Sequence, residues 1–279
     1  MLLTLLLSGG TALGYGISDF VGGRASRSER PVRVAAFSHI AGLAGMLVAA
    51  LLWGATHVSA SDLAWGAVAG ISGGGGIFSL YAALRAGRMG VVAPITAAIG
   101  ASLPVLYGTL AGERLPLISI AGLAVVFAAI LLVSIPRADG HEPLSRSALG
   151  FSVMAGVFFS GSFILLSNTT PASGLWPAVA LRIVSVAVLA TGALLTTHGV
   201  LPGRHVLGAT IAAGLVETAA TVFMLLAVQS GPIAVAAVVG SLYPAVTALL
   251  ARAALDERLA RHQIAGLGIA LAGVVLLSF

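Results

Sequence analysis

The chain contains no cysteine and no lysine, and few charged residues of either sign. Without cysteine it can form neither a disulfide nor a thiolate metal site. Only 8% of its 279 residues are charged, whereas about 25% are charged in a soluble domain. The chain therefore cannot cover itself with a solvated surface. A net charge of +5 would indicate nucleic acid in a soluble protein, but membrane orientation explains it better here. We expect no nucleic-acid partner, metal or cofactor.

What the chain does contain is long apolar sequence. Hydrophobic residues make up 58% of it, and the mean hydropathy is +1.07. A helix needs about 20 apolar residues to cross a bilayer. We therefore predict an all-α polytopic membrane protein with ten transmembrane helices, embedded in a lipid bilayer. The predicted spans are residues 2–22, 32–54, 63–84, 89–111, 116–135, 147–168, 175–197, 204–228, 232–252 and 262–279.

An internal repeat relates the two halves of the chain. Residues 83–135 and 227–279 align without a gap at an offset of 144 positions, with 16 of 53 pairs identical. Five spans in each half is an odd number, so the second half must enter the membrane inverted relative to the first. We predict two inverted five-helix repeats, over residues 1–135 and 147–279, joined by a loop at 136–146. Inverted repeats are how many carriers achieve alternating access.

The arginines predict the orientation in the membrane. Loops after the odd-numbered spans contain 12 of the 14 arginines, the opposite side contains Arg114, and Arg182 lies inside a span. The positive-inside rule places the odd-numbered loops in the cytoplasm. Both termini are then predicted to lie outside the cytoplasm. Because the fused repeat already supplies two halves, we expect a functional monomer, with a homodimer as the alternative.

The repeat resembles a known carrier family in its motifs. A Gly-Glu-Arg-Leu or Asp-Glu-Arg-Leu element closes the fourth span of each half, at residues 112–115 and 256–259. With the ten-span pattern and Pro244, these elements resemble the EamA-type carriers of the drug/metabolite transporter superfamily. The first copy departs from the pattern, with Gly100 in the equivalent position and its proline at Pro104. Members are often drawn with cytoplasmic termini, the reverse of the arginine count.

The resemblance implies an exporter or exchanger of small metabolites, amino acids or drugs, with a central cavity between the halves. An intramembrane enzyme is the competing class. The sequence has no HExxH or P-loop motif, so it has neither the metalloprotease motif nor the motif for direct coupling to ATP. We therefore expect a secondary carrier of the inner membrane and no enzyme. A non-transporting assembly protein is a further alternative.

Ionisable residues inside predicted spans are candidates for the substrate or proton pathway. Glu217 lies near the middle of its span, where an ionisable group costs about 2.5–3.5 kcal/mol and is rare unless functional. We predict that it couples transport to protons; the alternative is a packing role beside neighbouring threonines. Arg182 either pairs with Glu217 or substrate, or extends to the interface. His39, next to Ser38, either transfers protons or binds the ligand, or it serves only in packing. For Asp19, the sequence favours an interfacial ion pair with Arg24, and a transport role is the alternative.

Aromatic, proline and glycine residues complete the predicted site. Tyrosines either line the cavity or form the interfacial belt, and Tyr243 is the best cavity candidate. Prolines remove a backbone donor and should bend their helices. The unbroken glycine run weakens a helix at its middle, which predicts close packing and a hinge. The residues are Tyr15, Tyr81 and Tyr243; Pro94, Pro104 and Pro244; and Gly73, Gly74, Gly75 and Gly76.

Overall fold

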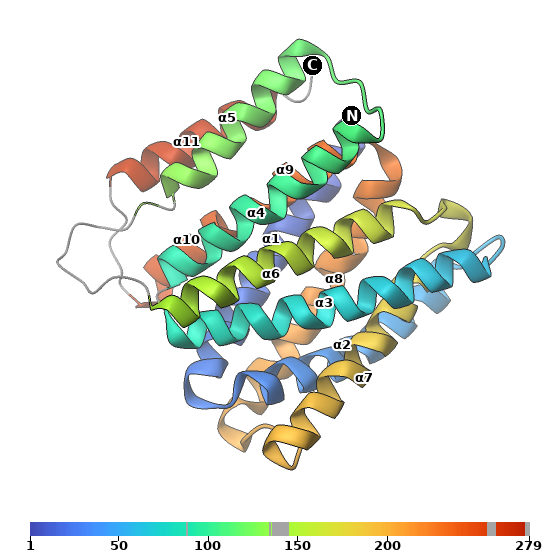
Figure 1. Ribbon diagram of the computed structural model, residues 1–279, viewed down its shortest axis with the longest axis vertical. Coiled ribbons are helices and arrows are strands. Elements are labelled where there is room, and N and C mark those ends of the chain that lie inside the picture. Colours follow the sequence, from blue (N-terminus) through green and yellow to red (C-terminus); the bar gives the residue numbers. More distant parts are fainter. Residues whose placement is uncertain (88, 134, 136–144, 256–260, 277–279) are drawn as a thin grey trace.

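The structure, a computed structural model, describes residues 1–87, 89–133, 135, 145–255 and 261–276 (Figure 1). Within these ranges all regular structure is helical. In chain order the elements are α1 (Leu2–Ser28), α2 (Pro31–Trp53), α3 (Ala60–Ala86), α4 (Met89–Leu110), α5 (Leu117–Val133), α6 (Arg146–Ser167), the 3-10 turn η1 (Pro171–Ser173), α7 (Trp176–Thr197), α8 (Arg204–Ser230), α9 (Ile233–Gly240), α10 (Tyr243–Leu255) and α11 (Arg261–Leu276).

Helix ends follow local sequence signals. Ser59 and Ser145 are the N-caps of α3 and α6, and their hydroxyls accept hydrogen bonds from Ser61 N and Ala148 N. Such a side chain satisfies a backbone donor that has no partner in the first turn. Pro31 opens α2, where its missing N–H costs nothing.

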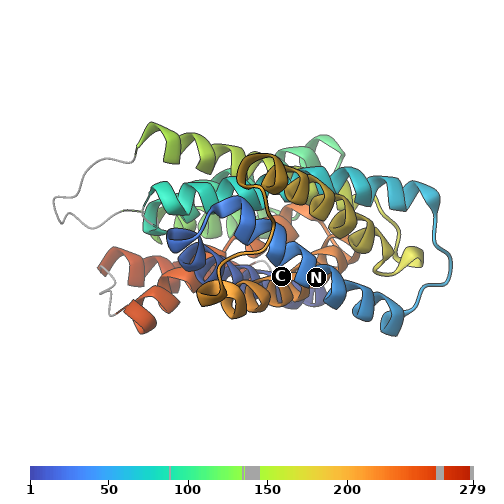
Figure 2. The same ribbon diagram turned by 90° about the horizontal axis from the view of Figure 1, so that it is seen from below.

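The helices form two rows, which Figure 2 shows from below. In one row the packing order is α7, α3, α6, α4, and in the other it is α2, α8, α1, followed by α9 and α10. Contacts of α2 with α7 and of α4 with α9 join the rows, and α5 pairs with α11 beside them (Figures 1 and 2). Each row therefore combines helices from both halves of the sequence.

Glycines allow the closest helix crossings. A β-carbon at Gly70 of α3 would overlap the carbonyl oxygen of Leu181 in α7, and one at Gly214 of α8 would overlap that of Ser38 in α2. Such close approach of helix backbones is typical of membrane helices, where small residues replace a hydrophobic driving force. The first crossing packs α3 against α7 next to Arg182, and the second packs α8 against α2 next to His39.

The outer surface is apolar. Leu52, Leu110, Leu117 and Leu195 are each at least 76% exposed, which suits contact with lipid and not with water. Among the described residues, five helices are long and apolar enough to cross a bilayer: α2, α3, α6, α7 and α8. Shorter apolar helices cover Ile95–Leu110, Leu117–Leu132 and Ile233–Thr247. The all-helical membrane class is thus confirmed, while ten spans and their inverted arrangement stay predictions.

Candidate functional site

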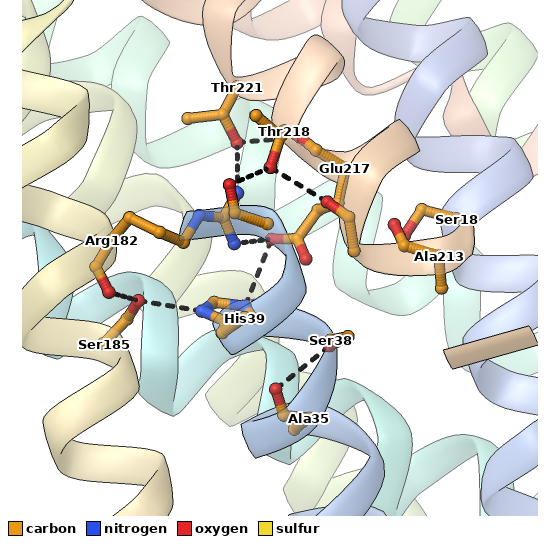
Figure 3. Close-up of polar contacts among 12 residues, drawn as sticks. Ser18, Ala35, Ser38, His39, Arg182, Ser185, Ala213, Glu217, Thr218 and Thr221 are labelled. Atoms are coloured by element: carbon orange, nitrogen blue, oxygen red, sulfur yellow. Dashed lines mark hydrogen bonds and ion pairs between the residues drawn. The ribbon is translucent and has the colours of Figure 1, made fainter. Parts of the chain in front are cut away.

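A buried ion pair joins α7 to α8. Arg182 of α7 is fully buried, and its Nη1 donates a hydrogen bond to Glu217 Oε1 of α8 over 3.1 Å (Figure 3). Its Nη2 donates to Thr221 Oγ1 at 3.2 Å. Desolvating two charges is expensive unless they are paired and hydrogen-bonded. Of the two sequence alternatives for Arg182, the structure therefore shows pairing with Glu217.

His39 of α2 contacts the same carboxylate oxygen. Its Nε2 lies 3.2 Å from Glu217 Oε1, an ion-pair distance without hydrogen-bond geometry. On the other side of the ring, Nδ1 lies 2.8 Å from Ser185 Oγ, and this hydroxyl donates to the Arg182 carbonyl oxygen at 3.0 Å. Which group donates at the Nδ1–Ser185 contact depends on the imidazole tautomer, and the neutral tautomer with its hydrogen on Nε2 directs that hydrogen at Glu217 Oε1. A bare Nε2 would face a carboxylate, so a proton belongs between His39 and Glu217.

Small residues and threonines assemble this cluster. Thr218 Oγ1 lies 3.0 Å from the carbonyl oxygen of Gly42 in α2 and 2.9 Å from that of Gly214 in its own helix. A β-carbon at Gly42 would lie 2.7 Å from the same hydroxyl. Glycine at this position is what allows α2 and α8 to approach, so that His39 reaches Glu217.

A small cavity between the rows opens beside Glu217. Its volume is ≈ 30 Å³, room for about two water molecules. The side chain of Glu217 is 90% buried, and its second oxygen, Oε2, has no hydrogen-bond partner. The lining residues are Tyr15, Asp19, Ile77, Thr96, Gly100, Phe159, Phe163, Glu217, Gly240, Ser241 and Tyr243.

The structure places Asp19 in this cavity and not at an interface. Asp19 is 4% exposed, and among the described residues nothing forms an ion pair with it. Arg24, five residues further along α1, is exposed. The interfacial pair between these two residues was the wrong interpretation, because α1 continues to Ser28 and keeps Asp19 well inside the helix.

Two of the three predicted tyrosines line the cavity. The Tyr15 hydroxyl donates to Met224 Sδ at 3.4 Å, and that of Tyr243 donates to the Ala93 carbonyl at 3.2 Å. Tyr81 is buried against α1, where a β-carbon at Gly22 would overlap its ring, and does not line the cavity. Ser38 is also buried away from it, and its hydroxyl donates to the Ala35 carbonyl within α2.

The predicted prolines behave differently in the two halves. The helix that contains Pro244 is interrupted, because α9 ends at Gly240 and α10 begins at Tyr243. Gly240 and Ser241, at this interruption, line the cavity. The counterpart helix α4 runs uninterrupted through Pro94 and Pro104.

The glycine run is helical and closely packed. The helix α3 continues without a break through Gly73, Gly74, Gly75 and Gly76. A β-carbon would lie 3.4 Å from Ser185 at Gly74, 3.0 Å from the Phe158 ring at Gly75 and 2.6 Å from the Phe159 ring at Gly76. The packing role therefore has a direct structural basis, and hinge motion stays a prediction.

Sequence reasoning missed the role of two other acids. Glu113, in the first Gly-Glu-Arg-Leu element, accepts hydrogen bonds from Ile233 N at 2.6 Å and Ala234 N at 3.3 Å, so it caps the N-terminus of α9. Asp62 is 3% exposed and joins α3 to the loop after α6, accepting from Thr170 and Ser173. The second element, residues 256–259, lies outside the described residues. The Gly-Glu-Arg-Leu motif marks Glu113 as a residue of interest in the sequence. The sequence does not indicate that Glu113 binds the N-terminus of α9.

Within the described ranges, no cluster of three or more histidine or acidic residues has the geometry to bind a metal ion.

Comparison with known proteins identifies the family. The model of the EamA-like transporter family matches the chain twice, over residues 2–135 and 146–279. The chain belongs to this family. The expected relationship to the EamA-type carriers of the drug/metabolite transporter superfamily is thus confirmed.

A solved structure shares the fold of this EamA-like chain. It is described only as the crystal structure of a protein, and it superposes with a TM-score of 0.75 at 21% identity, covering 97% of this chain and 94% of that chain. The search of curated proteins finds no significant match. Family membership makes the protein a multi-pass membrane protein of a transporter family.

Proposed function

We propose that the protein is a secondary carrier that exports or exchanges a small polar or amphipathic metabolite by alternating access. The observation that best supports this proposal is the Arg182–Glu217–His39 cluster, which lies beside a cavity between the two helix rows. Ionisable groups inside a membrane protein typically mark a substrate or ion pathway. The cavity is too small for a metabolite, so substrate would enter when the rows open toward one side.

The arrangement of helices supports ten spans as two inverted repeats. The starts of α3, α4 and α5 recur 144 residues later as the starts of α8, α9 and α11. Exchanging the halves also converts one set of contacts into the other: α3 with α7 becomes α8 with α2, and α3 with α6 becomes α8 with α1. In this scheme α9 and α10 together form the ninth span. Two such halves around a shared site are the usual basis of alternating access.

We propose proton coupling through Glu217. Its Oε1 is shared by Arg182 and His39, and a proton between the imidazole and the carboxylate would weaken the carboxylate's attraction to the arginine. Movement of α7 relative to α8 would then depend on that proton. The alternative is a facilitator or exchanger without proton coupling, in which the cluster is a permanent strut between α2, α7 and α8.

For location, we propose the inner membrane with both termini outside the cytoplasm, as the arginine distribution predicts. Cysteine-accessibility labelling of introduced single cysteines in the loops after α1 and α2 tests this orientation. The native chain has no cysteine that would interfere. Labelling of the first loop, but not the second, from the outside would reverse the orientation.

Counterflow in liposomes tests the carrier function. Purified protein should exchange a solute from a panel of amino acids, sugars, nucleosides and amines, and an imposed pH gradient should drive its accumulation. Glu217→Gln should remove the response to the gradient, while Glu113→Gln, an acid outside the cluster, should retain it. An unchanged pH response in Glu217→Gln would contradict the coupling role. Absence of movement for every solute under every gradient would favour a non-transporting assembly protein.

A further inference from the structure

The cavity contains a buried acid without a partner. Asp19 lines it and is 4% exposed, with no ion pair or hydrogen bond to any described residue. The nearest buried cation in the cluster, Arg182, is already held by Glu217 and Thr221 and does not line the cavity. Arg182 and Glu217 neutralise each other, so no cation of the cluster remains to stabilise the ionised form of Asp19, and a bound cation would supply that stabilisation.

Three of the four hydroxyl groups in the cavity wall are already engaged as donors, and the fourth, that of Ser241, forms no hydrogen bond with a described residue. The hydroxyls of Tyr15, Tyr243 and Thr96 donate to Met224 Sδ and to the carbonyl oxygens of Ala93 and Ser152. By contrast, Glu217 Oε2 is a buried acceptor without a partner. The wall thus presents the unpartnered carboxyl group of Asp19 and the free acceptor of Glu217, and few free donors. A buried acceptor without a partner is costly, which favours an occupant that donates hydrogen bonds.

Aromatic rings form much of the remaining wall. Tyr15, Phe159, Phe163 and Tyr243 contribute to it from α1, α6 and α10. The face of an aromatic ring attracts a cation, and the attraction is strongest where water is excluded. The same rings provide an apolar surface for the uncharged part of an amphipathic ligand.

We propose that this cavity, enlarged when the two helix rows open, binds a small organic ammonium compound with an aromatic or apolar body, and that Asp19 binds its charged nitrogen. The inference rests on the proposed carrier function and names the substrate class of that site. The N–H groups of the ammonium donate to Asp19 and to Glu217 Oε2, while the body packs on the aromatic rings. An anionic solute would face two carboxyl groups and no unpaired cation.

Ligands that differ only in charge test the proposal on purified protein. The probes are phenethylamine, 2-phenylethanol and 3-phenylpropionate, which share a phenyl group and a short chain. Near neutral pH the amine should raise the apparent melting temperature, and the alcohol and the carboxylate should not. Isothermal titration then gives the Kd of the amine. Equal or tighter binding of the alcohol or the carboxylate would overturn the proposal without any variant.

Two substitutions of buried aspartates test whether the ammonium group binds at Asp19. Asp19→Asn should weaken amine binding about tenfold or more, which corresponds to about 1.4 kcal/mol or more. Asp62→Asn is the matched control, because Asp62 is equally buried but lies outside the cavity, bound by Thr170 and Ser173; it should leave the Kd unchanged. Full affinity in folded Asp19→Asn would refute the role of Asp19. If the variant does not fold, Asp19→Glu should retain the preference for the amine, and loss of that preference would refute it.

Counterflow separates this proposal from the carrier function on which it rests. Phenethylamine should exchange across liposomes that contain the wild-type protein. Exchange of neutral or anionic solutes without binding of the amine would overturn the substrate class and leave the carrier intact. Binding of the amine without exchange of any solute would uphold the site and overturn the carrier.

Discussion

Glu113 caps the helix that begins at Ile233, 120 residues further along the chain. Its Oε1 accepts the Ile233 N–H at 2.6 Å and its Oε2 accepts the Ala234 N–H at 3.3 Å. A carboxylate at a helix N-terminus satisfies unpaired donors and interacts favourably with the helix dipole. An element that marks the family in sequence therefore connects the first half of the chain to the divided helix of the second.

Removing this cap should destabilise the protein. Glu113→Ala leaves the first N–H groups of α9 without their partner, which should cost about 0.5–2 kcal/mol. Thermal unfolding in detergent would show a lower melting temperature. The neighbouring Arg114 is exposed, so Arg114→Ala should melt like the wild type. Equal melting of Glu113→Ala and wild type would show that the cap contributes no stability.

The Arg182–Glu217 pair predicts a non-additive double mutant. Arg182→Met leaves Glu217 buried beside His39 without its main partner, which should destabilise the protein by about 3–5 kcal/mol. Adding Glu217→Gln removes the uncompensated charge and should restore much of that loss. Chemical unfolding of both single variants and the double variant measures the coupling free energy. Strictly additive effects would mean that the two side chains do not interact.

Glycine packing predicts a contrast between two positions in one helix. A β-carbon at Gly214 overlaps the Ser38 carbonyl, whereas one at Gly208 has no neighbour within 4 Å. Gly214→Ala should therefore force α2 and α8 apart and reduce yield and melting temperature. Gly208→Ala should be neutral or slightly stabilising, since alanine is the better helix former. Tolerance of alanine at both sites would argue against the close crossing.

The hinge hypothesis has its own test in α3. A β-carbon at Gly74 makes ordinary contact with Ser185 at 3.4 Å, so Gly74→Ala should fold normally and stiffen the run. Adding Gly75→Ala brings a β-carbon to 3.0 Å from the Phe158 ring, which that ring must accommodate. If the run bends during transport, the folded double variant should exchange solute more slowly. Wild-type exchange rates in the double variant would leave the glycines a packing role only.

Acid stability depends on Glu29 in the turn between α1 and α2. Its partial burial raises the pKa, but hydrogen bonds from the backbone of Arg30 and Gly203, with Arg33 and His205 nearby, lower it more, so the pKa lies below its ordinary value of 4.5. A group with a lowered pKa in the folded state stabilises above its unfolded pKa and loses that stabilisation as the pH falls through the folded one. The wild type should lose stability below about pH 4.5 more steeply than Glu29→Gln. Parallel melting curves of the two proteins against pH would contradict this.

Much of the architecture can be predicted from the sequence, because a bilayer restricts the secondary structures that a chain can form inside it. Apolar length predicts helices, and the 144-residue offset predicts where they recur. The bend expected at Pro244 coincides with the interruption between α9 and α10, whereas α4 continues through Pro94 and Pro104. The depth of Glu217 and Arg182 in the sequence was enough to single both out. All three features are local in sequence or depend on a regular spacing.

What escaped prediction depends on which helix lies next to which. Asp19 appeared interfacial because Arg24 follows it, yet α1 places it against the cavity beside Glu217. The Ser185 contact that orients His39 joins α2 to α7, and nothing in either segment indicates the other. The cap between Glu113 and α9 is similar, since hydrogen bonds between distant segments leave no periodic pattern in either one.

The mixed composition of the two rows has a consequence for synthesis. The helices α1 and α2 both pack against α8, and α3 packs against α6 and α7. When the ribosome has completed only the first half, these helices have inserted without their main neighbours. Their polar side chains, His39 and Asp19 among them, would then remain in lipid or in the translocon until α8 emerges. The assembly of this protein should accordingly be a late event, sensitive to the speed of translation through its second half and to any chaperone that shields α1 and α2 meanwhile.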